Sequence, residues 1–146
     1  MENSDNIFDI LKSDHRMVKE NFQKIIRNRD TNLYSQTLSA LTMHMSGEEA
    51  LLYPKVEANV GTRPWGFKLY EQHNAGKAFV GMIKSGMSDD KWVAQMEVLW
   101  DMLSYHIDFE ENQIFPAAMK FINERDAMEM GRQYKARSKI PMAATM

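Results

Sequence analysis

Cysteine is missing from the 146 residues of this chain. Without it the chain forms neither disulfides nor thiolate metal sites, and it has no cysteine nucleophile. An excess of charge is missing too, because 18 basic and 20 acidic residues leave a net charge of −2. This balance indicates neither a nucleic-acid partner nor an anionic membrane partner.

The sequence also lacks an apolar run that approaches the roughly 20 residues of a membrane span. Its first residues, Met-Glu-Asn-Ser-Asp, do not show the basic and then apolar pattern of a signal peptide. We therefore expect a cytoplasmic protein with no membrane partner. The length favours one domain over residues 1–146, with its core at about 5–122.

Strand patterns are absent, whereas apolar residues recur at alternating spacings of three and four along most of the chain. This predicts an all-α fold, an antiparallel up-down-up-down four-helix bundle with a short C-terminal helix. The expected segments are helices at about 6–29, 32–59, 64–85, 90–122 and 124–137, and a loose tail at 138–146. Ser4 or Asp5 is expected to cap the first helix, and Ser88 or Asp89 the fourth.

One eleven-residue motif occurs twice, as HMSGEEALLYP over residues 44–54 and as HIDFEENQIFP over residues 106–116. Both copies read histidine, three residues, two glutamates, three residues, aromatic residue, proline. Residues four apart share one face of a helix, so each copy presents an imidazole beside a carboxylate. The prolines, Pro54 and Pro116, predict a kink where each motif ends.

The four histidines of the chain all fall on inward-facing stripes, one on each long helix. A lone core histidine is usually a hydrogen-bonded packing residue, and a single His-x3-Glu pair is usually a surface pair. Counting from the turns at about 1.5 Å per residue brings the groups of three helices to one level, and those of the fourth join them if the third turn is loose or a helix end is misplaced. Since an unpaired buried carboxylate costs several kcal/mol, the combination predicts a bound cation. The candidate metal ligands are His15, His44, Glu48, His73, His106 and Glu110.

Six such ligands exceed the number that one tetrahedral zinc ion takes. Imidazole with carboxylate suits iron, although manganese or zinc could also occupy such a site. Two carboxylates could each bridge two ions, which would leave two histidines for each ion and vacant positions for a small ligand. The order of histidine and glutamate, and their spacing, differ from the Glu-x-x-His pattern of ferritin-like bundles.

This constellation resembles the hemerythrin-like, or HHE cation-binding, family in its four-histidine, two-glutamate form. The resemblance covers about Ser13 to Phe121 and implies a non-haem di-iron centre in a four-helix bundle. It further implies that the two glutamates bridge the irons, that one iron is bound by His15 and His44, and that the other is bound by His73 and His106.

The sequence departs from the oxygen-carrying hemerythrins, which it otherwise resembles, at Lys77. Those proteins place a further histidine there, one turn after the third-helix ligand, and beside it this chain has Gly76. The departure implies an open position at the second iron. The expected function is a di-iron sensor, scavenger or store for dioxygen, nitric oxide or peroxide. The alternatives are an oxidoreductase that consumes peroxide or nitric oxide, a protein of iron delivery or iron-centre repair, and a metal-free bundle; the oligomeric state stays open.

A metal-bound histidine normally donates its second ring N–H to a carboxylate, carbonyl or water. Four acidic residues are near enough in sequence to accept such bonds, although a solvated helix face explains each one better when it is considered alone: Asp14, Glu49, Glu71 and Glu111. Aromatic residues and one methionine could form the walls of the site: Met45, Tyr53, Trp100, Tyr105 and Phe115. Tyr70 could direct a hydroxyl at a bound ligand.

Overall fold

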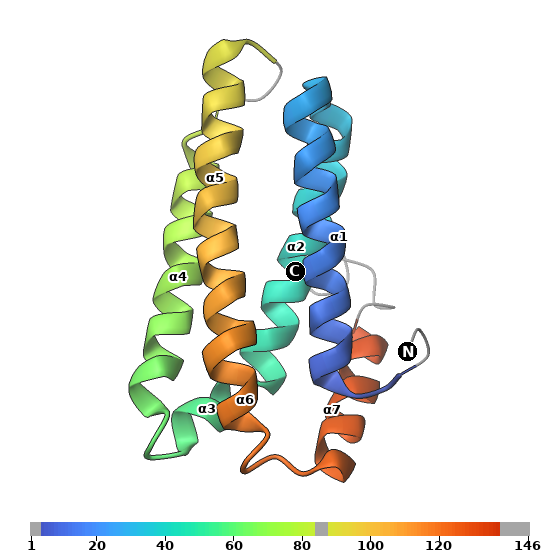
Figure 1. Cartoon of the computed structure of the whole chain (residues 1–146), viewed down its shortest axis with the longest axis vertical. Coiled ribbons are helices and arrows are strands. Elements are labelled where there is room, and N and C mark those ends of the chain that lie inside the picture. Colours follow the sequence, from blue (N-terminus) through green and yellow to red (C-terminus); the bar gives the residue numbers. More distant parts are fainter. Residues whose placement is uncertain (1–3, 84–87, 138–146) are drawn as a thin grey trace.

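A computed structural model describes residues 4–83 and 88–137 of the chain. Within those ranges all regular structure is helical and no strand occurs, which confirms the predicted all-α bundle with a short C-terminal helix. The elements are α1 (Ile7–Asn28), α2 (Thr31–Leu51), α3 (Tyr53–Ala58), α4 (Arg63–Gly81), α5 (Asp90–Phe109), the π-helical turn η1 (Glu110–Ile114), α6 (Phe115–Ala118) and α7 (Glu124–Arg137). Figure 1 shows α1, α2, α4 and α5 side by side, with α3 and α6 at one end and α7 beside α1.

Side-chain caps fix the starts of three long helices, and in α2 the Asp30 carboxylate accepts the Leu33 N–H. The Asp89 carboxylate accepts the Trp92 N–H and begins α5, as predicted. For α1 the predicted caps are wrong, because the Asn6 side chain accepts the Phe8 N–H and takes that position. The Ser4 hydroxyl lies before the helix and accepts the N–H of Asn6 instead.

The two prolines divide the helices in which they lie. The predicted second helix is two helices, because α2 ends at Leu51 and α3 begins at Tyr53, which places Pro54 in a first turn where no N–H is needed. The predicted fourth helix passes through the π-helical turn η1 before Pro116 and ends at Ala118. Turns of this kind are frequently found at functional sites.

Two further boundaries concern the ends of predicted segments. The third helix ends at Gly81, where the next two N–H groups bond in tighter turns to Phe79 and Val80. The predicted end at about residue 85 and the predicted tail at 138–146 lie outside the described residues. Among the described helices, none is both long enough and apolar enough to cross a membrane.

The apolar core is divided into two clusters. One gathers around α3, α6 and α7 and includes Leu11, Leu52, Leu69 and Phe115. The other lies toward the opposite end of the bundle and includes Val18, Leu41, Met96, Leu99 and Leu103. Each long helix therefore supplies apolar residues above and below one polar level, and the candidate ligands occupy that level.

The C-terminal helix α7 packs directly on α1 and α2. Gly131 allows this approach, because a Cβ at that position would collide with the carbonyl oxygen of Asp5. Gly47 of α2 does the same for the Tyr134 ring. The Tyr134 ring therefore packs against α2, the helix that carries His44.

Candidate metal centre

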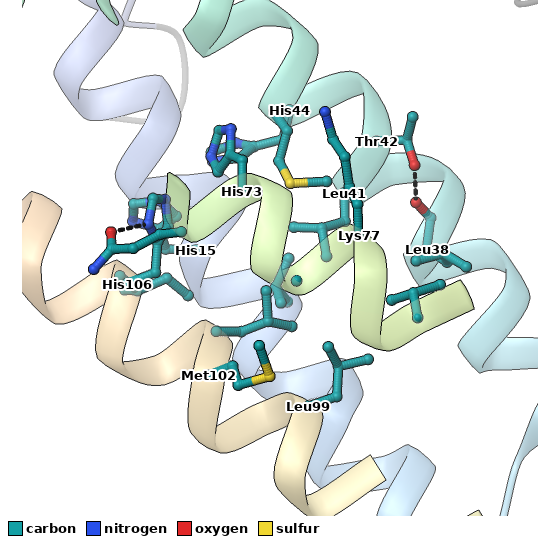
Figure 2. A pocket seen from close by; sticks show the side chains of 17 residues that line it. His15, Leu38, Leu41, Thr42, His44, His73, Lys77, Leu99, Met102 and His106 are labelled. Atoms are coloured by element: carbon teal, nitrogen blue, oxygen red, sulfur yellow. Dashed lines mark hydrogen bonds between the residues drawn. The ribbon is translucent and has the colours of Figure 1, made fainter. Parts of the chain in front are cut away.

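The structure brings the six predicted ligands to one buried level of the bundle. They come from all four long helices and from the π-helical turn: His15 from α1, His44 and Glu48 from α2, His73 from α4, His106 from α5 and Glu110 from η1. Both glutamates are 0% exposed, and no histidine exceeds 8%. In Figure 2 the four histidines gather at one end of a pocket.

The six residues form two groups with metal-binding geometry. Within each group, one potential ligand atom from every residue lies within 4.8 Å of the others. The first group is His15, His44, Glu48 and Glu110, and the second is Glu48, His73 and His106. Glu48 belongs to both groups, so its carboxylate lies where it could bridge two ions. These residues could therefore hold a metal.

Every histidine has its Nδ1 atom beside an oxygen acceptor. The partners are Glu111 Oε2 for His15 at 2.6 Å, Asp14 Oδ2 for His44 at 3.0 Å, Glu49 Oε2 for His73 at 2.7 Å and Gln72 Oε1 for His106 at 2.6 Å. Because these oxygens can only accept, each Nδ1 carries the proton and donates it. The Nε2 atom of each neutral ring then presents a lone pair, which is the form that binds metals.

Three of the four acidic residues proposed from the sequence thus contact a histidine, so the solvated-face interpretation is wrong for Asp14, Glu49 and Glu111. Glu71 is the exception, because its side chain is exposed. Its neighbour Gln72 faces the bundle and serves His106. The sequence signal for Gln72 was its position directly before His73. A glutamine on a helix is common, however, so this position did not distinguish it from other polar residues.

The inward Nε2 atoms lie close to carboxylate oxygens. Two lie near Glu48 Oε1, from His44 at 3.3 Å and from His73 at 3.2 Å. Two lie near Glu110, from His15 at 3.1 Å and from His106 at 3.5 Å.

Several of these atoms have no hydrogen-bond partner in the described part of the chain: His15 Nε2, Glu48 Oε2 and Glu110 Oε1. His15 Nε2 and Glu110 Oε1 are close but do not have hydrogen-bond geometry. Lone pairs that converge on one buried point repel each other unless a proton or a metal cation lies between them. The donor set, imidazole nitrogen with carboxylate oxygen, fits a hard or borderline transition metal.

The electrostatics of the metal-free cluster show how strongly it favours positive charge. Burial by itself would lower the pKa of His44, but Glu48, Asp14 and Glu110 together outweigh burial and raise this pKa well above its ordinary value. Burial is likewise outweighed at His15 and His73, whose pKa values are raised by Glu110 and Glu48. For Glu110, burial would raise the pKa, and the neighbouring imidazoles lower it well below its ordinary value. Protons and metal ions therefore compete for the same atoms.

Tyr53 lies inside the cluster, although the sequence suggested this residue only as part of the wall of the site. Its side chain is 0% exposed. Its hydroxyl donates to Glu110 Oε2 at 2.5 Å and lies 3.0 Å from Glu48 Oε1. The same oxygen is 2.9 Å from His73 Nε2 and 3.2 Å from His106 Nε2. Burial and the two glutamates raise the pKa of Tyr53 well above its usual value, so the hydroxyl keeps its proton.

Tyr134 of α7 reaches the cluster from the other side. Its hydroxyl donates to Asp14 Oδ2 at 2.5 Å and lies 3.3 Å from His44 Nδ1. Burial and the charge of Asp14 raise the pKa of Tyr134, so this hydroxyl is also a donor. The sequence did not point to Tyr134, because no spacing within α7 relates it to α1 or α2.

The other residues considered from the sequence have smaller roles. Met45 lines the pocket, and the Phe115 ring stacks on His15 at 6.0 Å. Tyr105 is 63% exposed and is not a wall, and Trp100 packs on Phe22 in the apolar cluster. Two residues near His73 contact the partners of that histidine. Tyr70 packs edge-on against Tyr53, and Lys77 Nζ lies 3.4 Å from Glu49 Oε2.

Comparison with known proteins agrees with this geometry. The family model described as the hemerythrin HHE cation binding domain matches residues 6–118. An uncharacterized hemerythrin-like protein of Schizosaccharomyces pombe is 26% identical over 141 residues, which cover 92% of this chain and 70% of that protein. A DNA nickase of a Nostoc species is also 26% identical over 141 residues, which cover 92% of this chain but 40% of the nickase. No solved structure matches the chain.

Proposed function

Because this chain belongs to the hemerythrin HHE cation-binding domain family, we propose that its buried cluster holds two iron ions. The centre binds dioxygen, nitric oxide or peroxide at an open position, and the protein acts as a sensor, scavenger or store. One observation carries this proposal: two groups of candidate ligands share Glu48, and all four imidazoles turn Nε2 toward them.

The residues divide into two halves around the shared carboxylates. His15 and His44 would hold one iron, and His73 and His106 would hold the other. Glu48 and the π-turn residue Glu110 would join them, since each lies beside imidazoles of different helices. Iron supplies reversible binding of small oxygen- and nitrogen-containing ligands. The protein supplies fixed imidazole orientations and a dry surrounding.

Lys77 does not act as a ligand in the proposed centre. It stands one turn after His73, and its ammonium group faces Glu49 rather than the cluster. The half that contains His73 and His106 thus has no further nitrogen ligand from this helix turn. The open position for the small ligand belongs to this half.

A second candidate is an oxidoreductase that consumes peroxide or nitric oxide. The position of Tyr53 favours it, because its protonated hydroxyl lies within 3.2 Å of both histidines of that half. This hydroxyl could donate a hydrogen bond to an oxygen-containing substrate held beside these histidines. Sustained turnover, in place of reversible binding, separates this candidate from the first.

The name of the Nostoc relative carries no proposal of DNA cleavage. The match covers 40% of that protein. The present chain also has a net charge of −2, whereas DNA binding draws on a basic surface. We therefore expect no nucleic-acid partner.

Metal content per chain, measured with the optical spectrum after expression with iron, tests the proposal. We expect two irons per chain and near-ultraviolet bands of a bridged di-iron centre. Glu110→Gln removes a shared carboxylate at nearly constant volume and is expected to lower the iron content to one or less. Glu71→Gln, an exposed glutamate in α4, is the matched control and should keep both irons.

The proposal is wrong if the wild type holds one zinc or no metal, or if Glu110→Gln matches Glu71→Gln in iron content. With iron present, peroxide, or nitric oxide with a reductant, then distinguishes the two candidates. Spectral changes that reverse on removal of the ligand indicate binding, and many turnovers per chain indicate an enzyme. Loss of iron to a weak chelator at neutral pH would instead favour iron delivery.

A further inference from the structure

A cavity of about 160 Å³ lies against the four histidines. All four imidazole rings line it, whereas Glu48, Glu110 and Tyr53 do not. The cavity therefore lies on the opposite side of the histidines from Tyr53. Figure 2 shows the histidines at one end and Leu38, Leu99 and Met102 at the other.

The walls of this cavity are mostly aliphatic and come from all four long helices. They include Val18 of α1, Leu41 and Met45 of α2, Val80 of α4, and Leu99 and Leu103 of α5. The exposed residues Thr42 and Lys77 mark where it reaches the surface, between α2 and α4. That side of the bundle is less closely packed than the sides formed by α1 with α2, α1 with α5 and α4 with α5.

The size of the cavity exceeds what a diatomic ligand needs. A molecule of that kind is little larger than a water, whose share of liquid volume is about 30 Å³. Protein interiors are otherwise closely packed, with few voids larger than a water molecule. An apolar cavity of about 150 Å³ in another protein is known to stay dry and to bind benzene. The cavity here has a similar volume and a similar aliphatic wall.

Gly76 keeps the cavity open on the α4 side. A Cβ at this position would meet no atom within 4 Å, although the residue is buried and lines the cavity. Glycine in a helix interior costs about 0.5–1 kcal/mol relative to alanine, so helix stability does not explain it. Any larger side chain would project into the cavity.

Charge limits the chemistry of the occupant. Lys77 is the cation at the opening, and its Nζ lies 3.4 Å from Glu49 Oε2, so a carboxylate already faces it. Farther inside, the lining is aliphatic apart from the imidazoles and the Gln72 amide, and it holds no carboxylate or ammonium group as a counter-ion for a charged molecule. A neutral apolar ligand suits these walls, with one end against the imidazole rings.

We propose that this cavity binds a neutral apolar organic molecule of about six to eight non-hydrogen atoms, the size of benzene or a short alkyl chain. This inference rests on the proposed function in one respect: the occupant lies beside the metal centre and is the molecule on which, or next to which, the centre works. Binding itself needs only the cavity.

Methyl NMR of the full chain with [13C]methionine tests the proposal, with benzene as the probe. Met45 and Met102 line the cavity and report on it. We expect saturable shifts of these two methyl signals in the wild type. Gly76→Leu fills the cavity and should weaken benzene binding at least tenfold. Gly81→Leu is the matched control, because Gly81 lies in the same helix with open space around it, is exposed and does not line the cavity.

Unshifted Met45 and Met102 signals at benzene saturation would overturn the proposal, as would equal benzene affinity in Gly76→Leu and Gly81→Leu. Gly76→Ala, which adds one methyl group and favours the helix, covers the case in which leucine prevents folding. It should reduce the affinity for toluene more than that for benzene, and equal reductions count against the cavity.

Iron content measured on the same samples separates the two proposals. Two irons without benzene binding would refute the cavity proposal alone. Benzene binding in a chain that takes up no iron would refute the di-iron proposal alone.

Discussion

Replacement of Tyr134 by phenylalanine tests whether α7 supports the candidate metal centre. The Tyr134 hydroxyl donates to Asp14 Oδ2 at 2.5 Å, and the same oxygen accepts from His44 Nδ1 at 3.0 Å. The substitution removes one oxygen atom and keeps the ring that packs over Gly47. The lost hydroxyl is therefore the cause of any effect.

The magnitude follows from the burial of the two partners. A hydrogen bond to a charged group contributes about 1.5–3 kcal/mol to the free energy of unfolding. Asp14 is 30% exposed, so water can replace the lost donor, and the lower end of that range applies. We expect a loss of about 1.5 kcal/mol, or a fall in Tm of about 3–6 °C for a chain of this size. Without the Tyr134 hydroxyl, Asp14 should also hold His44 less firmly, so we expect the metal affinity of Tyr134→Phe to fall about threefold to tenfold.

Urea unfolding of the metal-free chain and metal titration measure the two effects, with Tyr34→Phe as the control. Tyr34 also has a buried hydroxyl, but that hydroxyl has no hydrogen-bond partner in the described part of the chain. Its removal should leave the free energy of unfolding unchanged or slightly higher. If both variants behave alike, or if Tyr134→Phe alters stability without altering metal affinity, α7 is a packing element and does not support the site.

Two other predictions concern pH and the fit of α7. Because Glu48 raises the pKa of His44 against the effect of burial, the stability that this histidine gives the metal-free chain should be complete below about pH 6.5 and lost as pH rises through the raised pKa. Metal must displace the same proton, so metal affinity should rise over that pH range. Unfolding and metal titrations from pH 6 to 9 measure both quantities, and a free energy of unfolding that rises together with metal affinity would contradict this prediction. Gly131→Ala places a Cβ against the Asp5 carbonyl and should cost about 1–3 kcal/mol in thermal unfolding, whereas an unchanged Tm would show that α7 is not tightly packed there.

The helices and the cluster could be predicted because both follow from the regular spacing of residues along each helix. Helical spacing placed His15 and His73 between apolar residues that the structure buries, Leu11 and Val18 in the first case. The repeated His-x3-Glu motif placed a carboxylate beside each of the other two histidines. A buried carboxylate needs a cation, and this requirement links the pattern to metal chemistry without any knowledge of tertiary structure.

The remainder of the site depends on contacts between helices, which periodicity does not encode. Gln72 serves His106 only because α4 and α5 pack at this level. Tyr134 contacts Asp14 across 120 residues of chain. The break at Leu52 turns Tyr53 into the cluster, and the sequence predicted a kink there but not its direction. Each of these residues would look equally suited to a solvated face or an ordinary core.

The repeated motif also explains why the two halves of the cluster are chemically unequal. Both copies end in an aromatic residue and proline, and both aromatic rings pack on a histidine: Tyr53 on His73 with centroids 5.0 Å apart, and Phe115 on His15 at 6.0 Å. The two rings differ by one hydroxyl. Only the ring in the His73 half can donate a hydrogen bond, and it does so to Glu110. The candidate ligands are nearly symmetric, but the hydroxyl that bonds to a shared glutamate comes from the His73 half, whereas the Tyr134 hydroxyl on the other side bonds to Asp14.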